Sequence, residues 1–169
     1  PKAMQDDLLQ SPDQFEQRYT NVVANFGGAV GIDPAGIALY IAVTRAEARA
    51  KAAARLATAD LDADGTVTRP EAEQLATTLS ARQRGTLRKA FDVADANGDT
   101  RLSPAEQGAA AQRAAQRAIS RGEEAALRSL MLLDLNTDGV TSTAEVAQVA
   151  KAAADAAAAP QAALRQMRL

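Results

Sequence analysis

The sequence predicts an all-α protein that contains a repeated helix–loop–helix unit, and three observations support this prediction. Alanine, the strongest helix former, supplies 42 of the 169 residues, and only 3% of the residues are aromatic. Apolar residues recur at helical spacing over long stretches. Three twelve-residue clusters rich in Asp, Asn and Gly align without gaps, at 60–71, 95–106 and 134–145, and a helical stretch precedes and follows each of them.

Two helices are expected ahead of the repeats. The first ten residues are polar, and we expect them to be frayed. Ser11-Pro12 is a typical helix start, with an N-cap hydroxyl and a proline in the first turn, and Gly27-Gly28 ends that helix. Asp33-Pro34 starts a second helix, and the helical pattern then runs to Ala59.

Apolar residues precede each cluster at fixed positions, as expected for helices that feed a common core. The residues four positions before the three loops are Leu56, Phe91 and Leu130. The residues immediately before the loops are Ala59, Ala94 and Leu133. After the third loop, Lys151–Ala159 is Ala-rich and predicted to be helical, and Pro160 is expected to end or kink that helix.

The composition excludes several classes of function. The chain has no Cys and no His, which rules out disulfides, thiolate zinc sites and imidazole catalysis, and no nucleophile–base arrangement predicts an enzyme. No apolar run is long enough to predict a membrane span. Because the chain opens at Pro1 rather than Met, we expect a processed form. The absence of Cys suits the cytoplasm and the periplasm alike.

The three clusters carry oxygen-bearing side chains at alternating positions. Positions 1, 3 and 5 are Asp or Asn, position 9 is Thr or Ser, and position 12 is Glu, while position 7 offers a backbone carbonyl. A hard divalent cation takes six to eight such oxygens at roughly 2.3–2.6 Å. The candidate metal ligands are Asp60, Asp62, Asp64, Thr66, Thr68, Glu71, Asp95, Asn97, Asp99, Arg101, Ser103, Glu106, Asp134, Asn136, Asp138, Val140, Ser142 and Glu145.

The Glu at position 12 indicates calcium, because a carboxylate bound through both oxygens raises the coordination number beyond the six that Mg²⁺ prefers. The pattern D-x-[DN]-x-[DN]-G-x₅-E resembles the EF-hand family and is matched fully by 60–71 and 134–145. The loop 95–106 departs from it only at Thr100, where the family has Gly. The resemblance covers roughly residues 50–155.

The resemblance implies an EF-hand fold with short β-bridges between loops and three Ca²⁺ ions as cofactors. The hands are expected at about 48–80, 82–119 and 122–158, within a domain 34–169 that follows an N-terminal helix and connector over 1–33. Alanine- and arginine-rich usage suggests a bacterial source.

Two departures from the pattern carry expectations. Position 6 needs a positive φ, which is costly for a β-branched residue, so the loop with Thr100 is expected to bind most weakly. Position 8 bridges two loops; it is Val67 and Leu102 in the first two, which look like a pair, but Thr141 in the third. That odd third hand is expected to pair with the N-terminal helices or with a second copy of the chain.

A copy of the motif around Val43–Glu47 suggests a degenerate fourth hand over 36–47, although that register puts no ligand at positions 1, 3 and 5. The alternative is that 34–59 is one continuous helix.

The simplest alternative for the clusters themselves is a set of solvated turns followed by capping boxes. Capping explains positions 9 and 12 but not the carboxylates and amides at 1, 3 and 5, which would repel one another without a cation.

Three functions stay open. The first is a calcium sensor or buffer in which the ion orders a domain poor in large core side chains. The second is a calcium-dependent structural or interaction module of a secreted or periplasmic assembly. The third is a lanthanide-binding protein, against which the lack of Pro at position 2 argues. The basic residues on the helices are expected to form a solvated face or a surface for an acidic partner, and no nucleic-acid partner is expected because aromatic residues are absent there.

Overall fold

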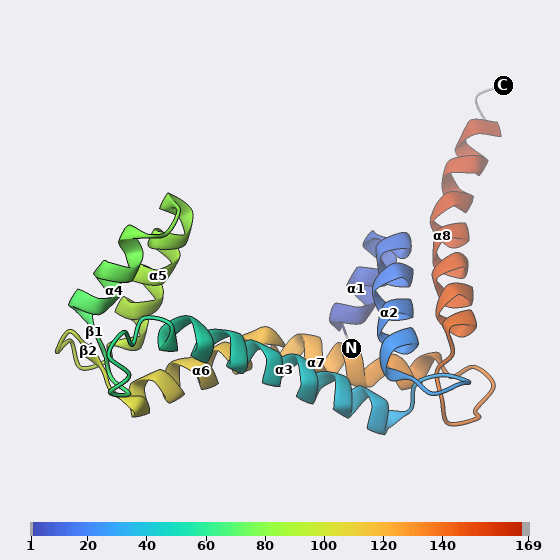
Figure 1. Cartoon of the computed structure of the whole chain (residues 1–169). Coiled ribbons are helices and arrows are strands. Elements are labelled where there is room, and N and C mark those ends of the chain that lie inside the picture. The colour runs from blue at the N-terminus through green and yellow to red at the C-terminus, as the bar shows by residue number, and fades with distance from the viewer. Residues whose placement is uncertain (1, 167–169) are drawn as a thin grey trace. The chain divides into compact units, whose positions relative to one another are not determined.

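The computed structural model describes the backbone of residues 2–166 and the side chains of residues 4–158. This part of the chain is all-α, with eight α-helices, one 3-10 helix and a single two-stranded ribbon (Figure 1). None of the described helices is apolar over enough of its length to cross a bilayer. The elements are α1 (Lys2–Gln10), α2 (Pro12–Phe26), α3 (Pro34–Ala57), β1 (Val67–Thr68), α4 (Arg69–Thr77), α5 (Ala81–Ala94), β2 (Arg101–Leu102), α6 (Pro104–Ala118), α7 (Arg121–Arg128), η1 (Ser129–Leu133) and α8 (Thr143–Gln166).

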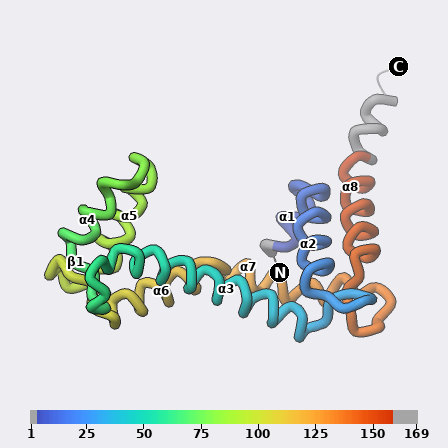
Figure 2. Tube along the Cα trace, viewed as in Figure 1, coloured from blue at the N-terminus to red at the C-terminus, as the bar shows by residue number. Residues whose placement is uncertain are grey.

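The chain forms two compact units. Unit 1 combines residues 1–42 with residues 120–169, and unit 2 is residues 43–119. The boundary lies inside α3, which is one continuous helix (Figure 2). The sequence-based division after residue 33 therefore differs from the division that the packing gives, because the N-terminal helices belong with the third repeat.

Unit 2 contains the first two repeats as a pair. The strands β1 and β2 are antiparallel, and Val67 faces Leu102 across the bridge, which confirms the expected pairing of these loops. Both residues are fully buried, as expected for the centre of a core that the two repeats share. The buried cluster of this unit is Leu56, Ala59, Val67, Ala72, Phe91, Ala94 and Leu102.

Unit 1 pairs the third repeat with the N-terminal segment. The helices α2 and α3 flank the connector 27–33, and an isolated antiparallel bridge joins Ile32 of this connector to Thr141 of the third loop. The two residues exchange N–H···O hydrogen bonds of 2.9 and 2.8 Å. The expectation of pairing with the N-terminal helices is confirmed, and the edge at Thr141 needs no second copy of the chain to complete it.

The helices of unit 1 pack around this bridge. The helix α2 lies beside α8, and α1 contacts both of them (Figure 1). The rings of Phe26 and Tyr40 meet edge to face, with centroids 4.9 Å apart, where α2 leads into α3. The side chains of Phe15 and Tyr19 in α2 are buried, and their ring centroids are 4.6 Å apart.

At both ends of the chain the helices extend further than expected. Residues 2–10 form the helix α1 rather than a frayed segment, because Met4 is buried and fixes this helix against its neighbours. The helix α8 continues through Pro160 to Gln166, so it does not end at this proline, and a kink there stays a prediction.

Two predictions about helix starts had different outcomes. Asp33 caps α3 as expected, since its carboxylate accepts a 2.7 Å hydrogen bond from the Gly36 N–H. Ser11 stands at the N-cap of α2, but its hydroxyl makes no capping hydrogen bond.

The suggestion of a degenerate hand over 36–47 was wrong, because α3 runs through that segment without a loop.

Candidate metal centres

Each twelve-residue loop begins where a helix ends and overlaps the start of the next helix. Loop 1 (60–71), loop 2 (95–106) and loop 3 (134–145) follow α3, α5 and η1, and they lead into α4, α6 and α8. Buried apolar residues hold the incoming helices in place, as the sequence predicted. These are Leu56, Ala59, Phe91, Ala94, Leu130 and Leu133.

The side chains at positions 1, 3 and 5 turn toward the interior of their own loop. In loop 3, the Asp134 carboxylate accepts hydrogen bonds from the backbone N–H groups of Asp138 (3.2 Å) and Gly139 (2.9 Å). The Asp138 carboxylate accepts one from the Val140 N–H at 3.0 Å, so each side chain folds back over the turn.

Loop 1 repeats these contacts at the same positions, and loop 2 differs from it in one donor. Asp60 accepts from the N–H groups of positions 5 and 6 at 3.2 and 3.0 Å, as Asp134 does. Asp95 accepts from positions 4 and 6 at 2.9 and 3.0 Å. At position 3, the distances from the accepting oxygen of Asp62, Asn97 and Asn136 to the N–H of position 5 are 3.2, 3.0 and 2.9 Å. Three separate stretches of sequence thus reach one local geometry.

The glutamate at position 12 reaches back across each loop. One carboxylate oxygen accepts from the N–H of position 2, at 3.0 Å in loop 1, 3.2 Å in loop 2 and 2.8 Å in loop 3. The other oxygen accepts from the N–H and the hydroxyl of position 9, which in turn caps the following helix. The residues that make the predicted capping boxes are therefore also the residues predicted to bind metal.

These hydrogen bonds keep the glutamates ionised. The Thr68 hydroxyl, followed by the backbone N–H of Thr68, lowers the pKa of Glu71 to about 2. The backbone N–H and then the hydroxyl of Ser103 lower the pKa of Glu106, and Ser142 lowers that of Glu145 in the same way. Because a lowered pKa favours the charged form, a cation that binds Glu71 at neutral pH displaces no proton from it.

Loop 1 brings its carboxylates closest together. One oxygen each of Asp60, Asp62 and Glu71 lie within 4.8 Å of one another. Loops 2 and 3 have Asn at position 3, and the side-chain amides of Asn97 and Asn136 each donate a 2.9 Å hydrogen bond to the Asp at position 5. Four anionic groups in loop 1 and three in each of the others, together with amide, hydroxyl and carbonyl oxygens, suit a hard divalent cation.

The donor set is arranged by depth in each loop. Asp60, Asp95 and Asp134 at position 1 are half-buried, whereas the side chains at positions 3 and 5 are exposed. The glutamate at position 12 is half-buried in the first two loops and buried in the third, where Glu145 is 7% exposed. Positions 1 and 12 therefore form the fixed side of each candidate centre, and the exposed residues close it from the solvent side.

Every loop has a positive φ at position 6, as predicted. The values are 85° at Gly65, 66° at Thr100 and 87° at Gly139. Position 4 also has a positive φ, which the sequence analysis missed: 61° at Ala63, 74° at Gly98 and 60° at Thr137. Each loop therefore carries one non-glycine residue in the left-handed region, and the backbone strain assigned to loop 2 alone is shared by all three.

The connector 27–33 is a second feature that the sequence analysis missed. A Cβ added at Gly31 would lie 2.6 Å from the Thr141 carbonyl oxygen, so only glycine permits the backbone to approach loop 3 this closely. The available signal was a third glycine close to Gly27-Gly28, just ahead of the Asp33 cap.

Comparisons with known proteins give no independent support. The chain matches no protein-family model, and neither the curated proteins nor the solved structures that were searched contain a match. A functional assignment therefore depends on the chemistry and geometry of the three loops.

Proposed function

We propose that the protein binds calcium through three EF-hand loops. The observation that carries the proposal is the recurrence of closely similar hydrogen bonds in loops 1, 2 and 3, in which side-chain oxygens at positions 1, 3 and 5 accept from backbone N–H groups of their own loop. The convergence of Asp60, Asp62 and Glu71 within 4.8 Å supports it further. Helix capping accounts for positions 9 and 12 only, and a solvated turn alone does not offset the repulsion among the four carboxylates of loop 1.

In this proposal the ligands of each ion are the side chains of positions 1, 3, 5, 9 and 12 and the carbonyl of position 7. The bound ion supplies positive charge where anionic groups otherwise repel one another. Three ions would change the formal net charge of the chain from −2 to +4. We expect the main effect to be ordering, since a cation that binds only the folded form adds its binding free energy to stability.

A calcium-dependent interaction module is the second candidate function. Unit 1 exposes large apolar side chains in the connector 27–33 and in η1, with Val30 71% exposed and Leu132 73% exposed. A partner or a second copy that covers them would bury this surface. A dimer on a sizing column that forms with Ca²⁺ and dissociates with chelator would favour this function over a monomeric sensor or buffer.

Substitution of the position-12 glutamates tests the proposal by stoichiometry. Glu71→Gln and Glu145→Gln should each remove one tight site from a calorimetric Ca²⁺ titration, because an amide supplies one neutral oxygen in place of a bidentate carboxylate. Glu73→Gln is the matched control; Glu73 lies on the same helix as Glu71 but pairs with Arg88. Equal stoichiometry in all three variants would contradict the proposal, and a Ca²⁺/La³⁺ competition titration tests the lanthanide alternative.

A further inference from the structure

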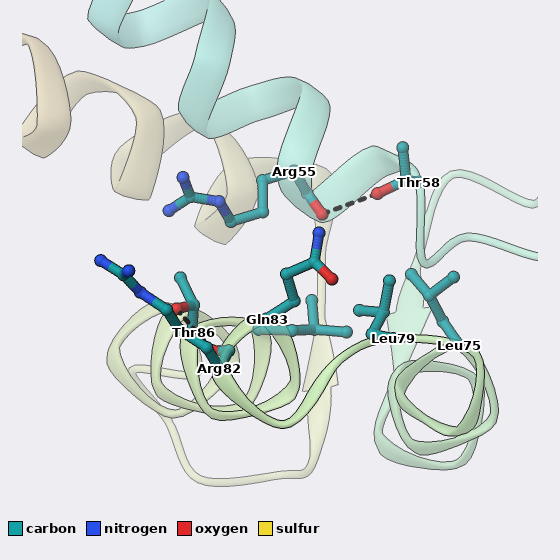
Figure 3. Close-up of a pocket in the computed structure, with 8 residues that line it drawn as sticks. Arg55, Thr58, Leu75, Leu79, Arg82, Gln83 and Thr86 are labelled. Atoms are coloured by element: carbon teal, nitrogen blue, oxygen red, sulfur yellow. Dashed lines mark hydrogen bonds between the residues drawn. The ribbon is translucent and has the colours of Figure 1, made fainter.

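We propose that a hollow in unit 2 binds a small anionic amphiphile, a molecule with one apolar chain and one negatively charged head. The hollow lies between the end of α3, α4 and the first half of α5, and its volume is about 570 Å³ (Figure 3). Sites for small molecules have volumes of this order. None of its lining residues belongs to the metal-binding loops, so the inference does not depend on the proposed calcium sites.

One end of the hollow is apolar. It is lined by Leu75 of α4, by Leu79 in the turn that follows α4, and by Leu87 of α5. Leu87 is buried and the other two leucines are half-buried, so together they leave apolar surface in contact with water. A short alkyl chain that lies along these three leucines would cover their exposed surface, and the chain would also be removed from water.

The other end is cationic. In Figure 3 the guanidinium groups of Arg55 and Arg82 lie on one side of the hollow, Leu75 and Leu79 lie on the other, and Gln83 stands between them. No ion pair involves Arg55 or Arg82 among residues 4–158, and both residues are exposed. Two unneutralised guanidinium groups at the mouth of an apolar site favour an anionic head over a neutral or cationic one.

A second hollow extends the cationic end. It shares Arg55, Arg82 and Thr86 with the first, is also lined by Lys89 and Arg117, and has a volume of about 410 Å³. No Asp or Glu lines either hollow. Four positive charges without a lining acid favour an anionic head at this end, since like-charged walls add their fields.

The dimensions favour a small amphiphile over a protein segment. Three leucines give room for one short apolar chain, whereas a docked helix presents anchors over two or three turns. An acidic protein segment with leucine anchors is the competing occupant, and the experiment distinguishes it.

The test compares decanoate with decyltrimethylammonium on the 169-residue chain, both below their micelle concentrations. We expect decanoate to shift the NMR signals of Leu75, Leu79 and Leu87, and to bind at least ~10-fold more tightly than the cation of equal chain length. The double variant Arg55→Gln/Arg82→Gln should weaken decanoate binding by ~10-fold or more.

The control is Arg49→Gln/Arg84→Gln, which removes the same charge from α3 and α5 outside both hollows and should leave binding unchanged. Far-UV circular dichroism checks that both double variants keep their helices. The proposal is overturned if decanoate shifts none of the three leucines, if the two surfactants bind equally, or if both double variants lose binding alike. It is also overturned if a helical peptide rich in Glu and Leu binds there and decanoate does not displace it.

Discussion

At the scale of single residues, the loops depend on backbone conformations that non-glycine residues adopt only at a cost. A left-handed conformation costs an L-residue roughly 1–2 kcal/mol. Loop 2 has this cost at Thr100 and loop 3 at Thr137, while the other positive φ of each loop falls on a glycine. The two loops are therefore strained to a similar degree, although only Thr100 departs from the sequence pattern.

Replacing these threonines by glycine should stabilise the calcium-loaded protein. We expect Thr100→Gly and Thr137→Gly to gain about 1 kcal/mol each, which raises the melting temperature by about 2–4 °C. Gly98→Ala, at the remaining positive φ of loop 2, is the opposite change and should destabilise; its added Cβ meets no neighbouring atom, so only the backbone is tested. A gain for Thr100→Gly without one for Thr137→Gly would contradict equal strain.

At the scale of elements, unit 1 depends on a connector that approaches a metal-binding loop at close range. The Ile32–Thr141 bridge joins the segment between α2 and α3 to loop 3. Thr141 is fully buried, and its hydroxyl donates a 2.8 Å hydrogen bond to the Leu130 carbonyl. The hydroxyl of Thr141 therefore explains why a threonine stands at this bridging position, where the other two loops have an aliphatic residue.

A methyl group placed at Gly31 should open this bridge. We expect Gly31→Ala to cost unit 1 about 1–3 kcal/mol, as overpacking against backbone does, because its Cβ would lie 2.6 Å from the Thr141 oxygen. The matched control is Gly28→Ala in the same connector, where the added Cβ lies 3.9 Å from its nearest neighbour. Chemical denaturation measures both; equal stability of the two variants would show that the bridge does not require glycine at 31.

The elements that the sequence predicted are those with strong local signals. Helical spacing and the Ser-Pro and Asp-Pro starts located α2 and α3, and the apolar residues at fixed distance from each loop proved to be buried. The helix α1 was missed because its sequence is polar, and Met4 is the one buried side chain among its residues 4–10. The Ile32–Thr141 bridge was missed because it joins residues more than one hundred positions apart, and no local pattern reports such a pairing.

The candidate site was predictable to a greater extent than the fold. The residues of each loop are contiguous in sequence, so the position of a residue within the twelve-residue loop is enough to predict whether its side chain turns inward. The positive φ at position 4 was not predictable in the same way, because Ala63, Gly98 and Thr137 share no side-chain chemistry. That conformation is a property of the turn rather than of the residue that occupies it.

At the scale of the whole molecule, the loops are distributed unequally, with two in unit 2 and one in unit 1. If calcium stabilises by binding the folded form, each site adds about 2.7 kcal/mol at a concentration 100 times its dissociation constant. Hydrogen exchange with and without chelator should therefore show larger calcium-dependent protection in unit 2 than in unit 1.

Two glutamate variants separate the calcium-dependent protection of unit 1 from that of unit 2. Glu71→Gln should reduce the calcium-dependent protection of peptides from 43–119, and Glu145→Gln should reduce that of peptides from 120–158. Far-UV circular dichroism should show less helix after chelation in the unsubstituted chain. An unchanged helical signal and an unchanged melting temperature would contradict calcium-induced ordering, even if the ions bind.

Calorimetric titration of the 169-residue chain with Ca²⁺, after removal of bound metal, tests the central claim most directly. The arrangement of oxygens in the three loops predicts saturation at three ions for each chain. Saturation at fewer ions would show that one of the loops is a helix-capping turn alone, and a titration without binding heat, repeated at a second temperature, would contradict calcium binding altogether.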